Sequence, residues 1–147
     1  MNRFGFRTTE WVKNGPFKLN GERLLIRGTH YHEDHAGVAA AVPDDEVRKT
    51  MKMIKDMGAN FIRLGHYQQA PLVLELCDEL GLMVWQEFMF ACAMYPTHHE
   101  FLDSVRDEVK HQVKRLMSHP CIVLWSGNNE NEEALITGWY EPTKKNP

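Results

Sequence analysis

One stretch of the sequence decides the fold class: Asn60-Phe-Ile-Arg-Leu-Gly-His-Tyr-Gln-Gln-Ala-Pro71-Leu-Val-Leu-Glu-Leu-Cys-Asp-Glu-Leu80-Gly-Leu-Met-Val-Trp-Gln-Glu87. Residues 60–65 and 82–87 are short, mostly apolar runs, as is typical of strands covered on both faces. Between them, Pro71 suits the first turn of a helix and Gly81 suits its end. A strand, a helix and a second strand in this order predict two parallel strands joined by a helical crossover.

The same alternation extends in both directions along the chain. Gly58 ends a periodic helical pattern, and the pair Thr97 and Glu100 has the spacing of a capping box at the start of a longer helix. The expected elements are a strand at 22–28, a helix at 44–57, a helix from about 97 to 118, a strand at 121–125 and a further helix that begins near residue 130. The sequence therefore predicts an α/β fold with a parallel sheet.

Residues 1–20 have a different pattern. Polar and apolar side chains alternate there, and the dipeptides Asn14-Gly15 and Asn20-Gly21 are turn signals. We expect a strand or hairpin that leads into the α/β part.

Composition limits the classes of partner. The chain has 147 residues, 43% of them hydrophobic and 25% charged, with a net charge of −3. No basic surface is therefore expected to recruit nucleic acid. The longest apolar run, residues 88–95, is far shorter than the roughly 20 residues of a membrane helix, and no signal peptide is visible at the start. The three cysteines are widely spaced, which fits buried thiols and indicates no compartment.

Polar side chains stand at the end of each predicted parallel strand. The first is followed by His30, His32, Asp34 and His35, and the second carries Arg63 and His66 at its end. Glu87 ends the third, and Asn129 and Glu130 follow the fourth. Because the carboxyl ends of parallel strands share one edge of the sheet, we expect one shared site. A carboxyl held behind an apolar strand and Trp125 is partly desolvated, which suits Glu130 to act as a general acid. The alternative is that Glu130 begins a helix, where negative charge is also favourable.

The histidines offer a competing interpretation. Residues 29–35, Thr-His-Tyr-His-Glu-Asp-His, resemble the metal-binding loop of metallo-β-lactamase-fold hydrolases. His30, His32, Asp34 and His35 would then bind two metals that activate a water. Otherwise these imidazoles line a polar cleft or pack within a loop.

A family resemblance is carried by several motifs in order. The motifs are similar to those of the glycoside hydrolases of family two, which include β-galactosidases, β-glucuronidases and β-mannosidases. They lie at residues 4–10, 19–22, 26–28, 60–63, 66–67 and 77–85. The second half, with residues 85–96, 118–120, 124–135 and 139–140, is most similar to β-mannosidases. Residues 27–35 and 65–67 are closer to the galactosidases. Leu64 and Glu87 depart from the mannosidase pattern, which has tryptophan and aspartate there.

The resemblance implies a (β/α)₈ TIM barrel of which only about the first four βα units are present. Residues 1–20 then match the end of a β-sandwich domain and the lead-in strand, and residues 21–147 match the N-terminal half of the barrel. The C-terminal half of the barrel, with the nucleophilic glutamate, would be missing, so we expect the 147 residues alone to be inactive. A truncated chain that at most binds sugar is a further alternative.

The resemblance also assigns roles. It implies a retaining exo-β-glycosidase that acts on terminal β-linked sugars of an oligosaccharide or glycoside, most similar to β-mannosidase, with a β-galactosidase-like enzyme as the alternative. Glu130 is then the general acid/base and Asn129 contacts the sugar 2-hydroxyl. Arg63, Glu87 and His66 line the sugar subsite. We expect no cofactor and no catalytic metal, and Trp139 either stacks on a sugar face or packs in the core.

Overall fold

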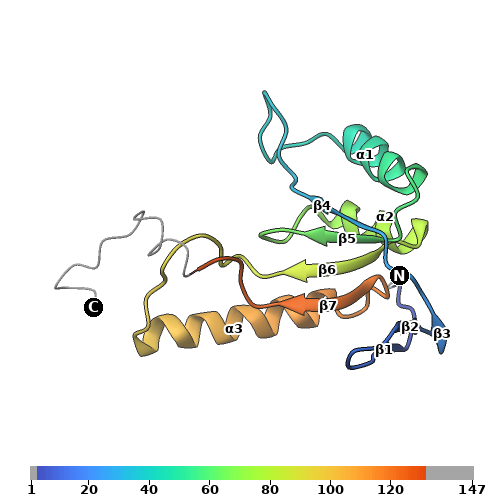
Figure 1. Ribbon diagram of the computed structural model, residues 1–147. Helices are drawn as coiled ribbons and strands as arrows, with labels where there is room; N and C mark the ends of the chain where they lie inside the picture. The colour runs from blue at the N-terminus through green and yellow to red at the C-terminus, as the bar shows by residue number, and fades with distance from the viewer. Residues whose placement is uncertain (1–2, 132–147) are drawn as a thin grey trace.

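The protein folds around two sheets, which the computed structural model describes over residues 3–131 (Figure 1). The first sheet is antiparallel and three-stranded, with β1 (Thr9–Trp11), β2 (Phe17–Leu19) and β3 (Glu22–Arg23) side by side. The second is parallel and four-stranded. Its order is that of the chain: β4 (Gly28–Tyr31), β5 (Phe61–Leu64), β6 (Met83–Glu87) and β7 (Ile122–Ser126).

One helix separates each pair of neighbouring parallel strands. These are α1 (Asp44–Asp56), α2 (Pro71–Leu80) and α3 (His99–Leu116). The predicted strand–helix–strand at residues 60–87 is confirmed, with α2 beginning at Pro71 and Gly81 adopting the left-handed conformation directly after it. Within the described residues, no helix combines the length and apolar character needed to cross a membrane.

The main core lies between the parallel sheet and α1 and α2. The helix α1 contributes Val47, Met51 and Ile54. They pack with even-numbered strand residues such as Ile62 and Val84, both fully buried. Each such side chain contributes about 1.5–3 kcal/mol through removal of apolar surface from water.

The odd-numbered residues of β5 and β6 point to the other face of the sheet. Phe61 and Met83 pack there with Phe17 of β2 in a second, smaller cluster. Because side chains alternate along a strand, Arg63 and Glu87 share this face with them, farther along the same strands. The alternation thus separates the helix-covered core from a polar cluster at the carboxyl ends.

The first parallel strand differs from the prediction of a strand at 22–28. Glu22 and Arg23 pair antiparallel with β2, and the parallel strand begins only at Gly28. The apolar run between them is not a buried strand, because Leu25 is 70% exposed. Its neighbours Leu24 and Ile26 pack instead against the Phe17 cluster, so the chain crosses from one sheet to the other there.

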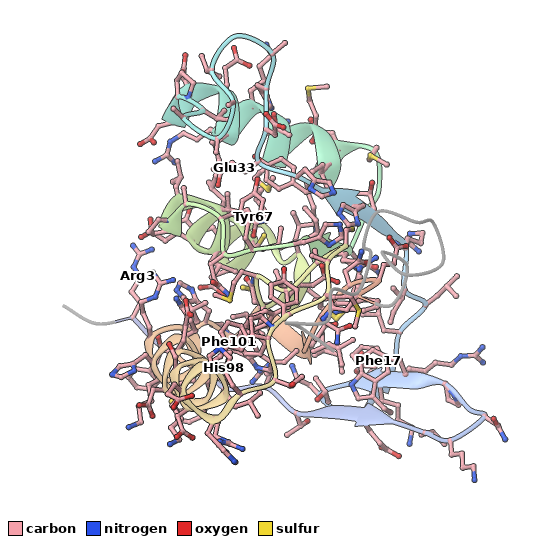
Figure 2. The ribbon with its side chains drawn as sticks, turned by 90° about the vertical axis from the view of Figure 1, so that its left-hand side faces the viewer. Arg3, Phe17, Glu33, Tyr67, His98 and Phe101 are labelled. Carbon is pink, nitrogen blue, oxygen red and sulfur yellow. The ribbon has the colours of Figure 1, made fainter. Side chains whose placement is uncertain are left out.

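The start of α3 also differs from the prediction. Thr97 is not the cap; the His98 ring nitrogen Nδ1 accepts a hydrogen bond from the Phe101 amide at 3.3 Å (Figure 2). Phe101 is half-buried, and Leu116 is the one buried residue of this helix. The helix predicted from about residue 130 lies almost wholly outside the described residues.

Candidate active site

Glu87 is the centre of a polar cluster at the carboxyl edge of the parallel sheet. Its side chain has no exposed surface. The Arg63 Nε donates to Glu87 Oε1 at 2.6 Å, and Arg63 Nη2 also contacts this oxygen. The His66 Nδ1 lies 2.6 Å from Glu87 Oε2. Both carboxylate oxygens are thus engaged, which is what a buried charge requires.

Arg63 links three strands of the sheet. Its guanidinium lies 4.8 Å from the centre of the Trp85 ring, in a cation–π arrangement. Its Nη2 donates to Asn129 Oδ1 at 2.6 Å, in the loop that follows β7. This contact fixes which end of the Asn129 amide faces Arg63 and leaves the Nδ2 group as a donor.

The loop after β7 is clamped to the loop after β6. The Asn129 amide donates to the Phe90 carbonyl at 2.8 Å, and the Cys92 amide donates to the Asn129 carbonyl at 2.9 Å. The Cys92 Sγ lies 3.7 Å from Asn129 Nδ2 and 3.9 Å from Glu130 Oε2. Sequence reasoning missed this role of Cys92, because a single cysteine in a loop carries no signal of its partner.

The surroundings of Glu130 differ from the prediction. Its side chain is exposed rather than partly desolvated, and its backbone is left-handed, with φ 52°. Trp125, expected to shield it, stacks on Phe88 at 5.5 Å between ring centres. The reason is that Glu130 stands beyond the end of β7, on a loop held through Asn129 and not over the strand itself.

Three imidazoles gather beside this cluster. The ring centres of His30 and His32 are 4.4 Å apart, and His66 lies 5.5 Å and 4.8 Å from them. Partial desolvation, followed by the neighbouring His32 and Arg63, lowers the pKa of His30. Asp34 is exposed and is not part of this cluster.

The four metal ligands of the competing interpretation, His30, His32, Asp34 and His35, are therefore not brought together. His35 belongs to a short turn, where its carbonyl accepts from the Ala39 amide at 2.8 Å. Only His30 and His32 of the loop join the cluster, and their third partner, His66, comes from the next strand end. Sequence spacing missed this because strand pairing, not the loop, brings His66 close to His30.

Gly65 permits the close packing of this cluster. A Cβ atom on Gly65 would lie 2.7 Å from His30 Cε1 and 3.0 Å from Glu87 Oε2. Both distances are shorter than ordinary van der Waals contacts, so a side chain at Gly65 would displace one group or the other.

A buried second layer supports the loop that carries His66. Glu33 Oε2 accepts from the Ala70 amide at 2.6 Å, at the start of α2, and Tyr67 donates to the Glu33 carbonyl at 3.0 Å (Figure 2). The Gln68 side chain donates to the Glu87 carbonyl at 3.0 Å. A carboxylate at a helix start also interacts favourably with the helix dipole.

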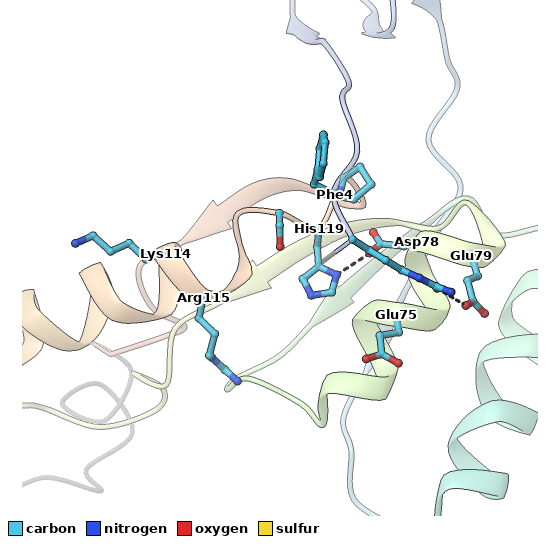
Figure 3. A pocket seen from close by; sticks show the side chains of 10 residues that line it. Phe4, Glu75, Asp78, Glu79, Lys114, Arg115 and His119 are labelled. Carbon is cyan, nitrogen blue, oxygen red and sulfur yellow. Dashed lines mark hydrogen bonds and ion pairs between the residues drawn. The ribbon is translucent and has the colours of Figure 1, made fainter. Parts of the chain in front are cut away.

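A cavity of about 1200 Å³ lies elsewhere, between α2, the end of α3 and the start of the chain (Figure 3). Two pairs of side chains meet in its lining: Arg3 with Glu79 at 3.1 Å, and His119 with Asp78 at 2.6 Å. Asp78 also accepts from the Cys121 amide. These contacts tie the turn before β7 to α2, so we assign this cavity a structural role and place the candidate site at the opposite strand ends.

Comparisons with known proteins identify the family. A sequence profile described as "Glycosyl hydrolases family 2, TIM barrel domain" matches residues 11–145. The chain belongs to glycoside hydrolase family 2. The alternative metallo-β-lactamase fold is therefore wrong, and the parallel sheet is part of a family 2 TIM barrel domain.

Relatives within family 2 carry more than one activity in their names. The chain is 47% identical to a β-mannosidase of Capra hircus, over 92% of this chain and 17% of that protein. It is 49% identical to the structure of a Parabacteroides merdae β-glucuronidase, with a TM-score of 0.82, over 88% of this chain and 16% of that one. A β-D-mannosidase of Dictyoglomus thermophilum is 36% identical, with a TM-score of 0.78, over 89% and 17%. The chain thus spans about a sixth of the length of these relatives.

Proposed function

We propose that this family 2 chain supplies the acid/base side of the active site of a retaining exo-β-glycosidase, most similar to β-mannosidase. The observation that carries the proposal is the bridge from Arg63 to both Glu87 and Asn129. This bridge brings the ends of three parallel strands together directly beside Glu130, at the edge where TIM barrel enzymes hold their catalytic groups.

Glu130 is the proposed general acid/base. In the first step it protonates the oxygen of the leaving group while a second carboxylate attacks the anomeric carbon, which gives a covalent glycosyl-enzyme. In the second step Glu130 takes a proton from water, which releases the sugar. The exposed position of its side chain suits a group that meets the leaving group and water in turn.

The sugar ring is proposed to sit over Arg63, Glu87 and His66, with Asn129 at its 2-hydroxyl. Hydrogen bonds hold the guanidinium, imidazole and amide of this set in place before a ligand binds. This lowers the entropic cost of binding, because these side chains are already ordered. Trp139, outside the described residues, is proposed to stack on a sugar face.

We further propose that residues 1–20 close a β-sandwich domain and that residues 21–147 form about the first four βα units of the barrel. The sheet order β4-β5-β6-β7 leaves β4 and β7 at its two edges, which are the strands that a closed barrel pairs with its remaining units. The nucleophile is then carried by the other half of the barrel.

Substrate preference is tested with a panel of aryl β-D-mannoside, β-D-galactoside and β-D-glucuronide, given to the complete enzyme that contains these residues. We expect the largest kcat/KM for the mannoside, on the strength of the mannosidase relatives. A larger kcat/KM for the galactoside or the glucuronide would replace the proposed specificity and would leave the acid/base role intact. No turnover of any of the three would overturn the proposed function.

A further inference from the structure

The imidazoles of His30, His32 and His66 gather at the mouth of the proposed sugar subsite. One ring nitrogen from each lies within 4.8 Å of the others. The three come from two neighbouring strand ends: His30 is in β4, His32 follows it, and His66 follows β5. Parallel pairing of β4 and β5 therefore creates the cluster.

Glu87 holds His66 in the orientation of a metal ligand. Its buried Oε2 lies 2.6 Å from His66 Nδ1, and no residue within 3–131 forms a hydrogen bond with His66 Nε2, which can therefore take another partner. A carboxylate on the far nitrogen of a histidine is the usual second layer of a protein metal site, where it fixes the tautomer and raises the basicity of the ligand.

A tetrahedral ion needs a tighter arrangement of the three imidazoles than the one observed. Zn²⁺–N bonds of about 2.0–2.1 Å place ligand nitrogens roughly 3.4 Å apart, so nitrogens that now lie within 4.8 Å of one another have to approach by up to about 1.4 Å. The rings of His30 and His32 are now stacked, with 27° between their planes, so metal binding requires them to turn about their side-chain bonds. Both side chains are exposed, which leaves room for this rotation. The positive charge of Arg63 is already balanced by Glu87, which limits its repulsion of a cation.

We propose that His30, His32 and His66 bind a single late first-row divalent cation of the Zn²⁺ class, at the mouth of the sugar cleft. Three imidazoles favour such ions over Mg²⁺ and Ca²⁺, which prefer oxygen ligands. The site differs from the metal-binding loop that residues 29–35 resemble, because it excludes Asp34 and His35. This cation has no part in hydrolysis.

A functional consequence rests on the proposed function. His66 shares Glu87 with Arg63, and both line the proposed sugar subsite. A cation on His66 Nε2 therefore competes with the sugar for the same space. Zn²⁺ is therefore expected to be a competitive inhibitor of hydrolysis, and its binding is expected to exclude binding of the monosaccharide product.

Calorimetric titration with Zn²⁺ tests the site directly, in the complete enzyme after removal of any histidine tag. We expect one Zn²⁺ per chain. His30→Gln and His32→Gln should each weaken binding roughly 10- to 100-fold or more. His35→Gln is the matched control, since His35 belongs to the same loop but not to the cluster, and its affinity should equal that of the wild type. Thermal unfolding of each variant shows whether the exposed substitutions leave the fold unchanged.

Two results would overturn the site: no stoichiometric Zn²⁺ bound by the wild type, or a His35→Gln variant weakened as much as His32→Gln. These binding results do not depend on turnover, so they are separate from the proposed function. Stoichiometric binding without competitive inhibition would overturn only the link between the cation and the sugar subsite.

Discussion

Arg63 and Glu87, on adjacent parallel strands, form an ion pair in which the carboxylate is completely buried and the guanidinium is 28% exposed. The same guanidinium reaches Asn129, and the same carboxylate reaches His66. One pair therefore sets the positions of the side chains that surround the proposed sugar subsite.

Removal of the Glu87 charge is expected to damage both stability and binding. Glu87→Gln leaves Arg63 without its counter-charge, and breaking a buried pair in this way costs about 3 kcal/mol. Chemical denaturation should show this loss in the free energy of unfolding, and the KM for the preferred glycoside should rise.

Glu79→Gln is the control for this prediction. Glu79 pairs with Arg3 at 3.1 Å, but both side chains are more than half exposed. Such a surface pair is worth about 0–1 kcal/mol. Equal losses from Glu79→Gln and Glu87→Gln would contradict the special role of the buried pair.

Gly65→Ala is expected to disturb the cluster through space alone. The new Cβ displaces the His30 ring or Glu87 Oε2, because it would stand within 3.0 Å of both. Overpacking of this kind costs about 1–3 kcal/mol. Gly127→Ala is the control, since no atom lies within 4 Å of its Cβ position. Unchanged stability and KM in Gly65→Ala would show that the cluster is not tightly packed.

The three thiols are expected to react very differently with iodoacetamide. Burial raises the pKa of Cys77 to about 12 from a usual 9.0, so its thiolate at pH 8 is about a thousandfold scarcer than that of an ordinary cysteine. Burial also raises the pKa of Cys121. Cys92, which is half-buried beside Glu130, should be labelled first. Mass spectrometry of the native protein that finds Cys77 labelled as fast as Cys92 would contradict this.

The same shift has a definite sign for stability. The folded state keeps the Cys77 proton up to a pH of about 12, whereas the unfolded state releases it above about pH 9. The unfolded state therefore binds fewer protons in this window, and the free energy of unfolding should fall as pH rises from about 9 to 12. Denaturant titrations at pH 8 and pH 10 measure the effect, and a stability that rises over this range would contradict it.

Residues 1–147 by themselves are expected to give no turnover. A retaining mechanism needs two carboxyl groups about 5–5.5 Å apart. Among the described residues, Glu87 is bound by Arg63 and His66, and Glu33 holds the start of α2. The strands β4 and β7 also leave two sheet edges without a partner strand in the described part, which favours self-association. A soluble monomer with turnover that Glu130→Gln abolishes would contradict this expectation.

The sequence predicted those elements whose local signals agree with their packing. The helix at 71–80 has proline at its start, glycine after its end and an apolar face, and all three match the structure. The run around Leu25 was misread as a strand because its apolar pattern does not reveal which sheet receives it. The cap at His98 was missed because the helix begins one residue later than the Thr97–Glu100 spacing predicts, and the His98 ring accepts from the Phe101 amide.

The sequence predicts where the site lies, but not which of its side chains contact one another. Strand order alone places Arg63, Glu87 and Asn129 at one edge, and the structure confirms that they meet. The cluster of His30, His32 and His66, and the clamp at Cys92, depend on loop conformations after β4, β5 and β6. Spacing along the chain does not encode those conformations, so the sequence suggested Asp34 and His35 as partners instead.

The role of Glu130 is tested most directly by Glu130→Gln in the complete enzyme, with rates of the glycosylation step for two β-glycosides of the same sugar. One substrate carries an activated aryl leaving group and the other an alkyl leaving group. An activated aryl group departs with little protonation, so its rate should fall far less than that of the alkyl glycoside, whose loss should reach about 100-fold or more. Each tenfold difference corresponds to about 1.4 kcal/mol of barrier. Equal losses on both substrates would contradict the assignment of Glu130 as the general acid.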